Sequence, residues 1–166
     1  EEAMETERVS SAAAEIGRTI LVRLAPGEDV FEGLRTVCER HGLRSGRIAT
    51  MIGSLRTASL VCMTPDPDAP GRVVYLEPRT IDGPLELIAV QGVFGWDDDK
   101  DELSIHLHAQ VAGEDLRPFA GHLADTGKNR ILATAEIDLD VFEGAELRRS
   151  FDEETGFTLF KIFPKL

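Results

Sequence analysis

Alternating apolar and polar residues run through long stretches of the chain, and this period of two is typical of β-strands that bury one face. The alternation is clearest in residues 103–111 and 131–142. Shorter apolar or β-branched runs predict further strands at residues 18–24, 47–51, 55–63, 73–76, 85–94, 117–123 and 157–163. A β-sheet is therefore expected to form most of the fold.

One segment near the N-terminus has the spacing of a helix instead. Its apolar residues recur at intervals of three and four and form a single stripe: Val30, Phe31, Leu34, Val37 and Cys38. Glu28 and Asp29 precede the stripe, where negative charge favours a helix N-terminus. Gly42 is placed to end the helix after His41, whose imidazole is expected to interact with the C-terminal end of the helix dipole.

Residues typical of turns separate the predicted strands. Three prolines within residues 64–71 predict a loop, residues 82–84 and 113–115 predict turns, and the charged run 97–102 predicts a solvated connection. Gly53 and Ser54 interrupt a strand pattern, as a bulge or a tight bend would. The chain has no internal repeat or linker, so residues 17–166 are expected to form one α+β domain after a loose acidic tail, residues 1–16.

Composition narrows the classes of partner and compartment. The net charge is −12, because 30 acidic residues outnumber 18 basic ones, and such acidity disfavours non-specific binding of nucleic acid. Cys38 and Cys62 lie among apolar residues and are expected to be buried and reduced. No apolar run has transmembrane length, and the acidic N-terminal residues lack the apolar core of a signal peptide. These features predict a cytoplasmic protein without membrane contact.

Three of the four histidines can form a metal site. His106 and His108 lie two residues apart in a predicted strand, so both imidazoles should project from one face, and His122 follows a predicted turn that can return it beside them. Three imidazoles can hold a divalent transition metal and leave coordination positions open, and zinc matches best, although iron, nickel and copper also accept imidazole. The alternative is three partly buried histidines that hydrogen-bond to the backbone.

Other polar residues are weaker candidates for function. An anion or nucleic-acid contact is considered for Arg44, Arg47 and Arg56, although exposed arginines on a sheet face are commoner. A role as general base or as hydrogen-bond partner of a ligand histidine is considered for Glu86, Gln91, Glu102 and Glu136. Trp96 is placed to cover a pocket or to anchor a loop. No phosphate-binding loop or nucleophile elbow occurs, so the residues leave open whether the protein is an enzyme.

Short motifs spread over the chain resemble those of a known family. In order they are Gly27-Glu-Asp-Val30, Ile52-Gly-Ser-Leu55, Asp82-Gly-Pro-Leu-Glu-Leu87, His106-Leu-His-Ala109, Gly121-His-Leu123, Ala133-Thr-Ala-Glu-Ile137 and Gly156-Phe-Thr-Leu-Phe160. Across residues 17–164 the chain resembles the plants-and-prokaryotes-conserved (PPC) domain. The resemblance implies an α+β fold with a mixed, mostly antiparallel sheet and a few flanking helices. It also implies a homotrimer, and in some prokaryotic members a metal on a histidine cluster that corresponds to His106, His108 and His122.

The same resemblance leaves the function open. Plant members of the family are nuclear DNA-binding proteins that carry an AT-hook of the Arg-Gly-Arg-Pro type, whereas Gly46-Arg-Ile48 and Gly71-Arg-Val73 of this chain lack the second basic residue. Three functions are therefore considered. The first is a trimeric metal-binding protein acting on a small molecule, the second a DNA-binding or transcription-associated module, and the third a protein-interaction module.

Overall fold

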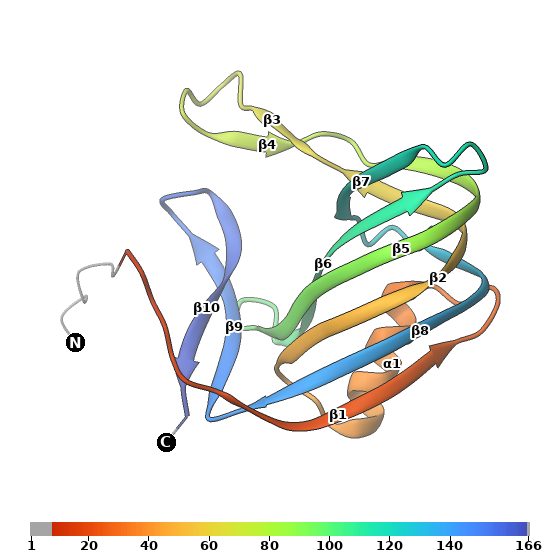
Figure 1. Cartoon of the computed structure of the whole chain (residues 1–166). Helices are drawn as coiled ribbons and strands as arrows, with labels where there is room; N and C mark the ends of the chain where they lie inside the picture. Colours follow the sequence, from red (N-terminus) through yellow and green to blue (C-terminus); the bar gives the residue numbers. More distant parts are fainter. Residues whose placement is uncertain (1–7, 166) are drawn as a thin grey trace.

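The computed structural model describes residues 8–165, and Figure 1 shows one long helix-backed sheet with two projecting hairpins. The elements are β1 (Glu15–Leu24), α1 (Val30–His41), β2 (Gly46–Val61), β3 (Met63–Pro65), β4 (Val73–Tyr75), β5 (Arg79–Asp97), β6 (Glu102–Ala112), β7 (Pro118–Leu123), β8 (Arg130–Glu143), β9 (Ala145–Asp152) and β10 (Phe157–Pro164).

Eight strands form one sheet in the order β1-β8-β2-β7-β6-β5-β9-β10, and β3 and β4 form a separate hairpin. The pairing of β5 with β9 is parallel and the other strand pairings are antiparallel. Because β2 also pairs with β5, the strands β2, β5, β6 and β7 close into a ring. The sheet is therefore mixed, and part of it is curled on itself.

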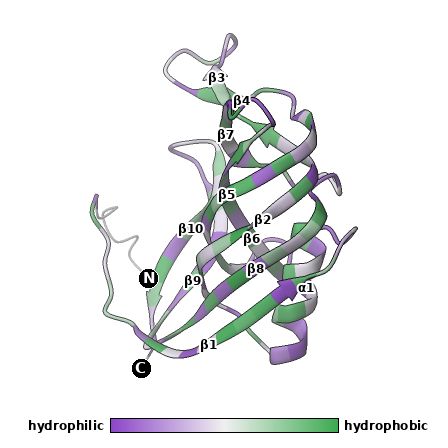
Figure 2. Ribbon diagram, turned by 45° about the vertical axis from the view of Figure 1, so that its right-hand side comes forward, coloured by the Kyte–Doolittle hydropathy of each residue, from purple (hydrophilic) through white to green (hydrophobic). Residues whose placement is uncertain are grey.

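The helix α1 covers one face of this sheet and supplies part of its core. Phe31 and Leu34 are buried in one apolar cluster with residues of β2, β5, β6 and β8. Figure 2 shows hydrophobic and hydrophilic residues alternating along the strands, as expected when one face packs and the other meets solvent. Within residues 8–165 α1 is the one α-helix, so the fold is richer in sheet than an α+β domain with several flanking helices.

The predicted limits of the helix are confirmed. The Asp29 side chain accepts hydrogen bonds from the backbone N–H groups of Phe31 and Glu32 at 3.1 and 3.2 Å, which satisfies donors that have no partner within the helix. Gly42 ends the helix in a left-handed conformation with φ of 63°, which costs glycine least.

Several strand boundaries differ from the predicted ones. Residues 47–51 and 55–63 lie mostly in the single strand β2, which passes through the predicted interruption at Gly53. A Cβ on Gly53 would lie 2.0 Å from the backbone oxygen of Thr134, so glycine is needed for the close approach of β8 at this bulge. The prediction of a turn at residues 82–84 is wrong. β5 continues through it, with Gly83 and Pro84 bulged opposite Arg56.

The N-terminal boundary also differs. β1 begins at Glu15, where it pairs with Glu143 of β8, so the last two residues of the predicted tail belong to the sheet. Residues 8–14 form neither helix nor strand, and residues 1–7 of that tail lie outside the described residues.

The two cysteines have different environments. Cys38 is buried in the core, and burial raises the pKa of its thiol to about 11. Cys62 is exposed, contrary to the prediction, because β2 ends at Val61 and the chain leaves the sheet there toward the β3–β4 hairpin. Among the described residues no helix is long and apolar enough to cross a membrane.

Replacing the buried Asn129 should destabilise the fold strongly. Its side-chain oxygen accepts from the Ser59 N–H and its amide donates to the Ala124 carbonyl, both at 2.8 Å. Asn129→Ala leaves the Ser59 N–H and the Ala124 carbonyl unpaired in the interior. This loss should lower the free energy of unfolding by about 2–5 kcal/mol. Urea denaturation measures this change in the free energy of unfolding. Asp66→Ala, which removes one acceptor in the exposed β3–β4 hairpin, should change stability by less than about 0.5 kcal/mol. Equal effects of the two variants would contradict this account.

Candidate metal centre

The alternation of β6 places its histidines on the outer face of the sheet. Leu107 and Ala109 point into the core and are 0% and 3% exposed. His106 and His108 therefore lie on the opposite face, one on each side of Leu107. The turn at residues 113–117 returns the chain as β7, which pairs with β6 so that His122 lies directly opposite His108. Sheet register thus brings three histidines of one chain together.

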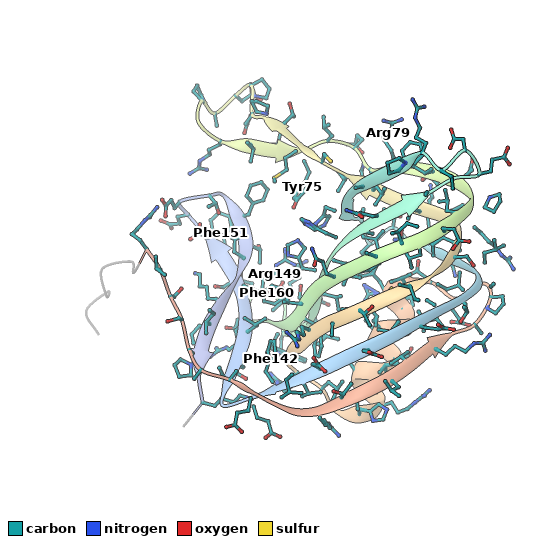
Figure 3. The ribbon with its side chains drawn as sticks, viewed as in Figure 1. Tyr75, Arg79, Phe142, Arg149, Phe151 and Phe160 are labelled. Atoms are coloured by element: carbon teal, nitrogen blue, oxygen red, sulfur yellow. The ribbon has the colours of Figure 1, made fainter. Side chains whose placement is uncertain are left out.

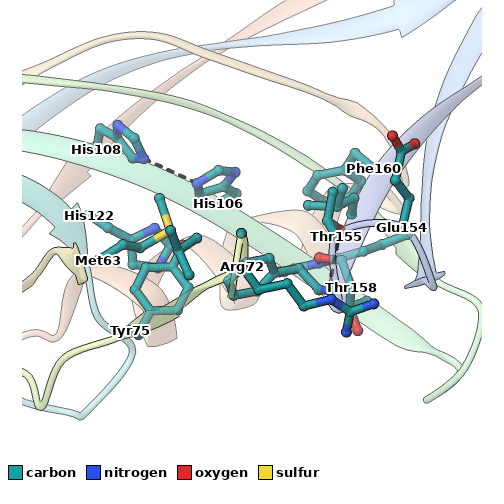
Figure 4. Close-up of a pocket in the computed structure, with 15 residues that line it drawn as sticks. Met63, Arg72, Tyr75, His106, His108, His122, Glu154, Thr155, Thr158 and Phe160 are labelled. Atoms are coloured by element: carbon teal, nitrogen blue, oxygen red, sulfur yellow. Dashed lines mark hydrogen bonds between the residues drawn. The ribbon is translucent and has the colours of Figure 1, made fainter. Parts of the chain in front are cut away.

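The three imidazoles are close enough to share one ion, and we call them the histidine triad. One ligand nitrogen of each lies within 4.8 Å of the others. The ring centroids are separated by 5.0 to 5.6 Å, and the Nε2 atoms of His106 and His108 are 3.2 Å apart (Figure 4). Two nitrogens bound tetrahedrally to zinc at about 2.05 Å are about 3.3 Å apart, so this pair matches the spacing of zinc ligands.

The electrostatic setting favours the neutral form of two imidazoles, those of His106 and His122. Burial lowers the pKa of His122 to about 4, with smaller contributions from His106, His108 and Arg149. Burial also lowers the pKa of His106, assisted by His108 and Arg149. Neutral imidazole is the form that ligates a metal. In addition, Nδ1 of His122 is buried and has no hydrogen-bond partner among the described residues, so the donor set fits a metal better than a structural hydrogen-bond network.

A pocket of about 550 Å³ opens beside the histidine triad. One wall comes from the β3–β4 hairpin and the other from the β9–β10 hairpin (Figure 4). Tyr75 links the two walls, because its ring lies 5.1 Å from that of His122 and 5.6 Å from that of Phe157. The side chains of these two walls are largely apolar and include Met63, Val73, Leu159 and Phe160. The site can therefore enclose a small molecule next to the imidazoles.

Arg149 is the main residue of this pocket that sequence analysis missed. Its Nη1 donates to Ser104 Oγ at 2.8 Å and its Nε to the Thr158 carbonyl at 2.9 Å. Ser104 precedes His106 by two residues on the same face of β6, so the guanidinium is held next to the histidine triad. Figure 3 shows Arg149 and Phe160 on the β9–β10 hairpin and Tyr75 on β4. The only signal in the sequence was the pair Arg148–Arg149, in a segment where no strand was predicted.

The predicted partners of the histidines lie in different places. Gln91 on β5 is paired with His108, whereas Glu86 on β5 and Glu136 on β8 are exposed farther along the sheet and Glu102 is exposed at the start of β6. None of these four side chains hydrogen-bonds to an imidazole in the described part of the chain. Trp96 donates from Nε1 to Asp101 at 3.0 Å and so anchors the turn between β5 and β6.

The three candidate arginines do not converge. The Arg44 guanidinium stacks 3.8 Å from the ring centroid of Trp96, and Arg47 Nε donates to Asp140 at 3.0 Å. Arg56 is exposed nine residues farther along β2, about 30 Å from Arg47 at the rise of an extended strand. The structure therefore gathers no single anion pocket from these residues.

Comparison with known families identifies the fold. Residues 11–143 match the Plants and Prokaryotes Conserved (PCC) domain, the family that the motifs resemble. The chain belongs to this family. No curated protein matches the sequence.

Solved structures share the fold of this PCC domain. The metal-containing protein AF0104 from Archaeoglobus fulgidus superposes with a TM-score of 0.76 at 24% identity, covering 92% of this chain and 99% of the other. A PPC protein from Pyrococcus horikoshii superposes with a TM-score of 0.71 at 24% identity, covering 95% of this chain and 100% of the other. A protein from Bacteroides thetaiotaomicron, named as a candidate DNA-binding protein, superposes with a TM-score of 0.72 at 20% identity. The match covers 89% of this chain and 94% of the other.

The lowered pKa of His122 predicts how the stability of the metal-free PCC domain depends on pH. The unfolded chain takes up this proton near the ordinary pKa of 6.5, whereas the folded protein takes it up near 4. Between these values the unfolded state binds more protons, so stability should fall as pH falls from 6.5 to 4 and the effect should level off below 4. Chemical denaturation in a chelator-containing buffer series measures the trend.

His122→Gln should flatten this dependence, because the titrating group is removed. His41→Gln is the matched control, since His41 is exposed at the end of α1. Identical pH profiles for the wild type and His122→Gln would contradict the assignment.

Proposed function

We propose that this PCC domain binds one divalent transition metal per chain through His106, His108 and His122, and that the bound metal assists chemistry on a small molecule. The observation that carries the proposal is the convergence of three ligand nitrogens within 4.8 Å. One of them belongs to His122, whose Nδ1 is buried and has no hydrogen-bond partner within residues 8–165. The metal-containing protein from Archaeoglobus fulgidus, which shares the fold, adds support.

Zinc is the proposed metal, because the spacing of the His106 and His108 nitrogens suits its tetrahedral geometry. A zinc ion held by three imidazoles supplies Lewis acidity toward a substrate oxygen. The chain contributes the remaining features of the site. The two hairpins flank the site with apolar side chains, and Tyr75 and Phe157 shape the space for a ligand.

Metal content tests the proposal directly. Protein purified without a histidine tag or chelator should contain close to one zinc per chain by elemental analysis. His106→Ala and His108→Ala should lose the metal, and His122→Ala should bind it much more weakly, because each removes one of three ligands. Affinity should also fall as pH is lowered, since a protonated imidazole cannot ligate.

His41→Ala is the control and should keep its metal, because this fourth histidine lies at the end of α1 and outside the cluster. Wild-type protein that carries no transition metal and takes up none on titration would overturn the proposal. That result would favour the alternative functions, DNA binding or protein interaction. The name of the Bacteroides neighbour favours DNA binding. The engagement of Arg44 and Arg47 with neighbouring side chains disfavours it, because contact with phosphates needs free positive charge.

We propose further that the protein is a homotrimer, on the basis of its family resemblance. Exposed apolar side chains on the outer face of the sheet offer surface for association, among them Leu21, Ile52 and Ile88, which are 79%, 49% and 51% exposed. Light scattering at micromolar concentration should give three chains per particle. A monomer or a stable dimer would contradict this prediction.

A further inference from the structure

Arg149 has no anionic partner among the described residues. Six ion pairs occur within residues 8–165, and they engage other cations, including the neighbouring Arg148 with Asp98. Arg149 instead contacts a hydroxyl, a carbonyl and the ring of Phe160, whose centroid lies 5.4 Å away. Arg149 is therefore a half-buried guanidinium whose partners among the described residues are all neutral.

The hydrogen-bonding capacity of Arg149 is also only partly used. A guanidinium has five N–H donors. One on Nε and one on Nη1 have acceptors, so three donors remain without an acceptor in the described part of the chain. The two bonds that form hold the group between β6 and β10 and leave the other donors for a ligand. Such a pre-positioned fork suits carboxylate or phosphate oxygens.

The charge of the pocket points to the same ligand class. Arg72 also lines the pocket, and a metal on the histidine triad would add two further positive charges. Among residues 8–165, Glu154 is the one carboxylate that lines the pocket, and it is paired with Arg8 at the exposed rim. Arg72 and Arg149 therefore place positive charge at the walls of this pocket, which favours an anionic ligand.

We propose that the pocket binds an amphipathic anion whose carboxylate or phosphate group contacts Arg149 beside the histidine triad. Its apolar part lies against the side chains of Tyr75 and Phe160, which belong to the apolar lining of the pocket. This inference rests on the proposed metal site, because it places the anionic group next to the ion. It adds the class of ligand that the site selects.

Calorimetric titration of the metal-loaded full chain tests the inference. The probes are benzoate, phenyl phosphate, benzamide and acetate. Benzoate or phenyl phosphate should bind at least about 10-fold more tightly than neutral benzamide, because a hydrogen bond to a charged group is worth about 10- to 100-fold in affinity. The tighter of the two anions identifies the head group. Acetate should bind more weakly than benzoate, because it lacks the apolar part.

Two substitutions on β9 form a matched pair. Arg149→Met should weaken binding of the preferred anion by about 10- to 100-fold and leave the metal content unchanged. Arg148→Met removes the same charge from the adjacent residue, which pairs with Asp98 and lies over Phe163, and should leave anion binding unchanged. Arg149→Lys keeps the positive charge but lacks the planar fork of N–H donors, so it should retain part of the affinity for the anion. This variant replaces Arg149→Met in the test if the methionine variant does not fold.

The outcomes separate this inference from the proposed function. Metal analysis of the same samples is the deciding measurement. Wild-type protein without metal overturns the proposed function and this inference with it. Metal-bearing protein that binds benzamide as tightly as both anions, or acetate as tightly as benzoate, overturns the ligand class alone. Unchanged anion affinity in metal-bearing Arg149→Met overturns the role of Arg149.

Discussion

The fold depends on a buried polar junction between Asp29 and Asn129, which are 1% and 0% exposed. One carboxylate oxygen of Asp29 caps α1 and the other accepts from the Asn129 N–H at 3.1 Å. The Asn129 side chain then joins Ser59 of β2 to Ala124, the residue that follows β7. Ala124 is two residues from His122, and the neighbouring end of β2 pairs with β7. The interaction that begins the helix therefore also fixes the strand that carries the third histidine.

The histidine triad opposes stability in the metal-free protein. His122 Nδ1 is buried and has no hydrogen-bond partner in the part of the chain that the structure describes, and its surroundings disfavour the protonated form that water would stabilise. An unpaired buried polar atom has a free-energy cost that the rest of the core must offset. Local departures from good hydrogen bonding of this kind concentrate at functional sites. A ligand that satisfies the three nitrogens would remove this cost, and binding to the folded state alone would stabilise the fold.

The parts predicted from sequence are those that depend on local patterns. Alternation in β6 placed His106 and His108 on one face, and the cap residues bounded α1 correctly. β9 was missed because charged and polar residues dominate it, and its contact with β5 is a short parallel pairing of Trp96 and Asp97 with Arg148 and Arg149. Such a pairing joins segments about 50 residues apart and leaves no local signal. The strand β10 was predicted at residues 157–163, but its hairpin with β9, and so the pocket wall that the hairpin forms, was not predictable.

Which arginines are free to bind an anion also depends on distant contacts. Arg47, a candidate from sequence, is paired with Asp140, which is 93 residues away, whereas Arg149 was not a candidate and has no acidic partner among the described residues. This arrangement separates two kinds of anion. A nucleic-acid backbone needs a row of exposed cations that follows its phosphates. One half-buried guanidinium at the wall of a pocket of about 550 Å³ instead suits a single small anion, which can enter and exclude water around its charge. The arrangement of charge at the site is thus that of a pocket for a small ligand and differs from the row of exposed cations that a nucleic-acid surface needs.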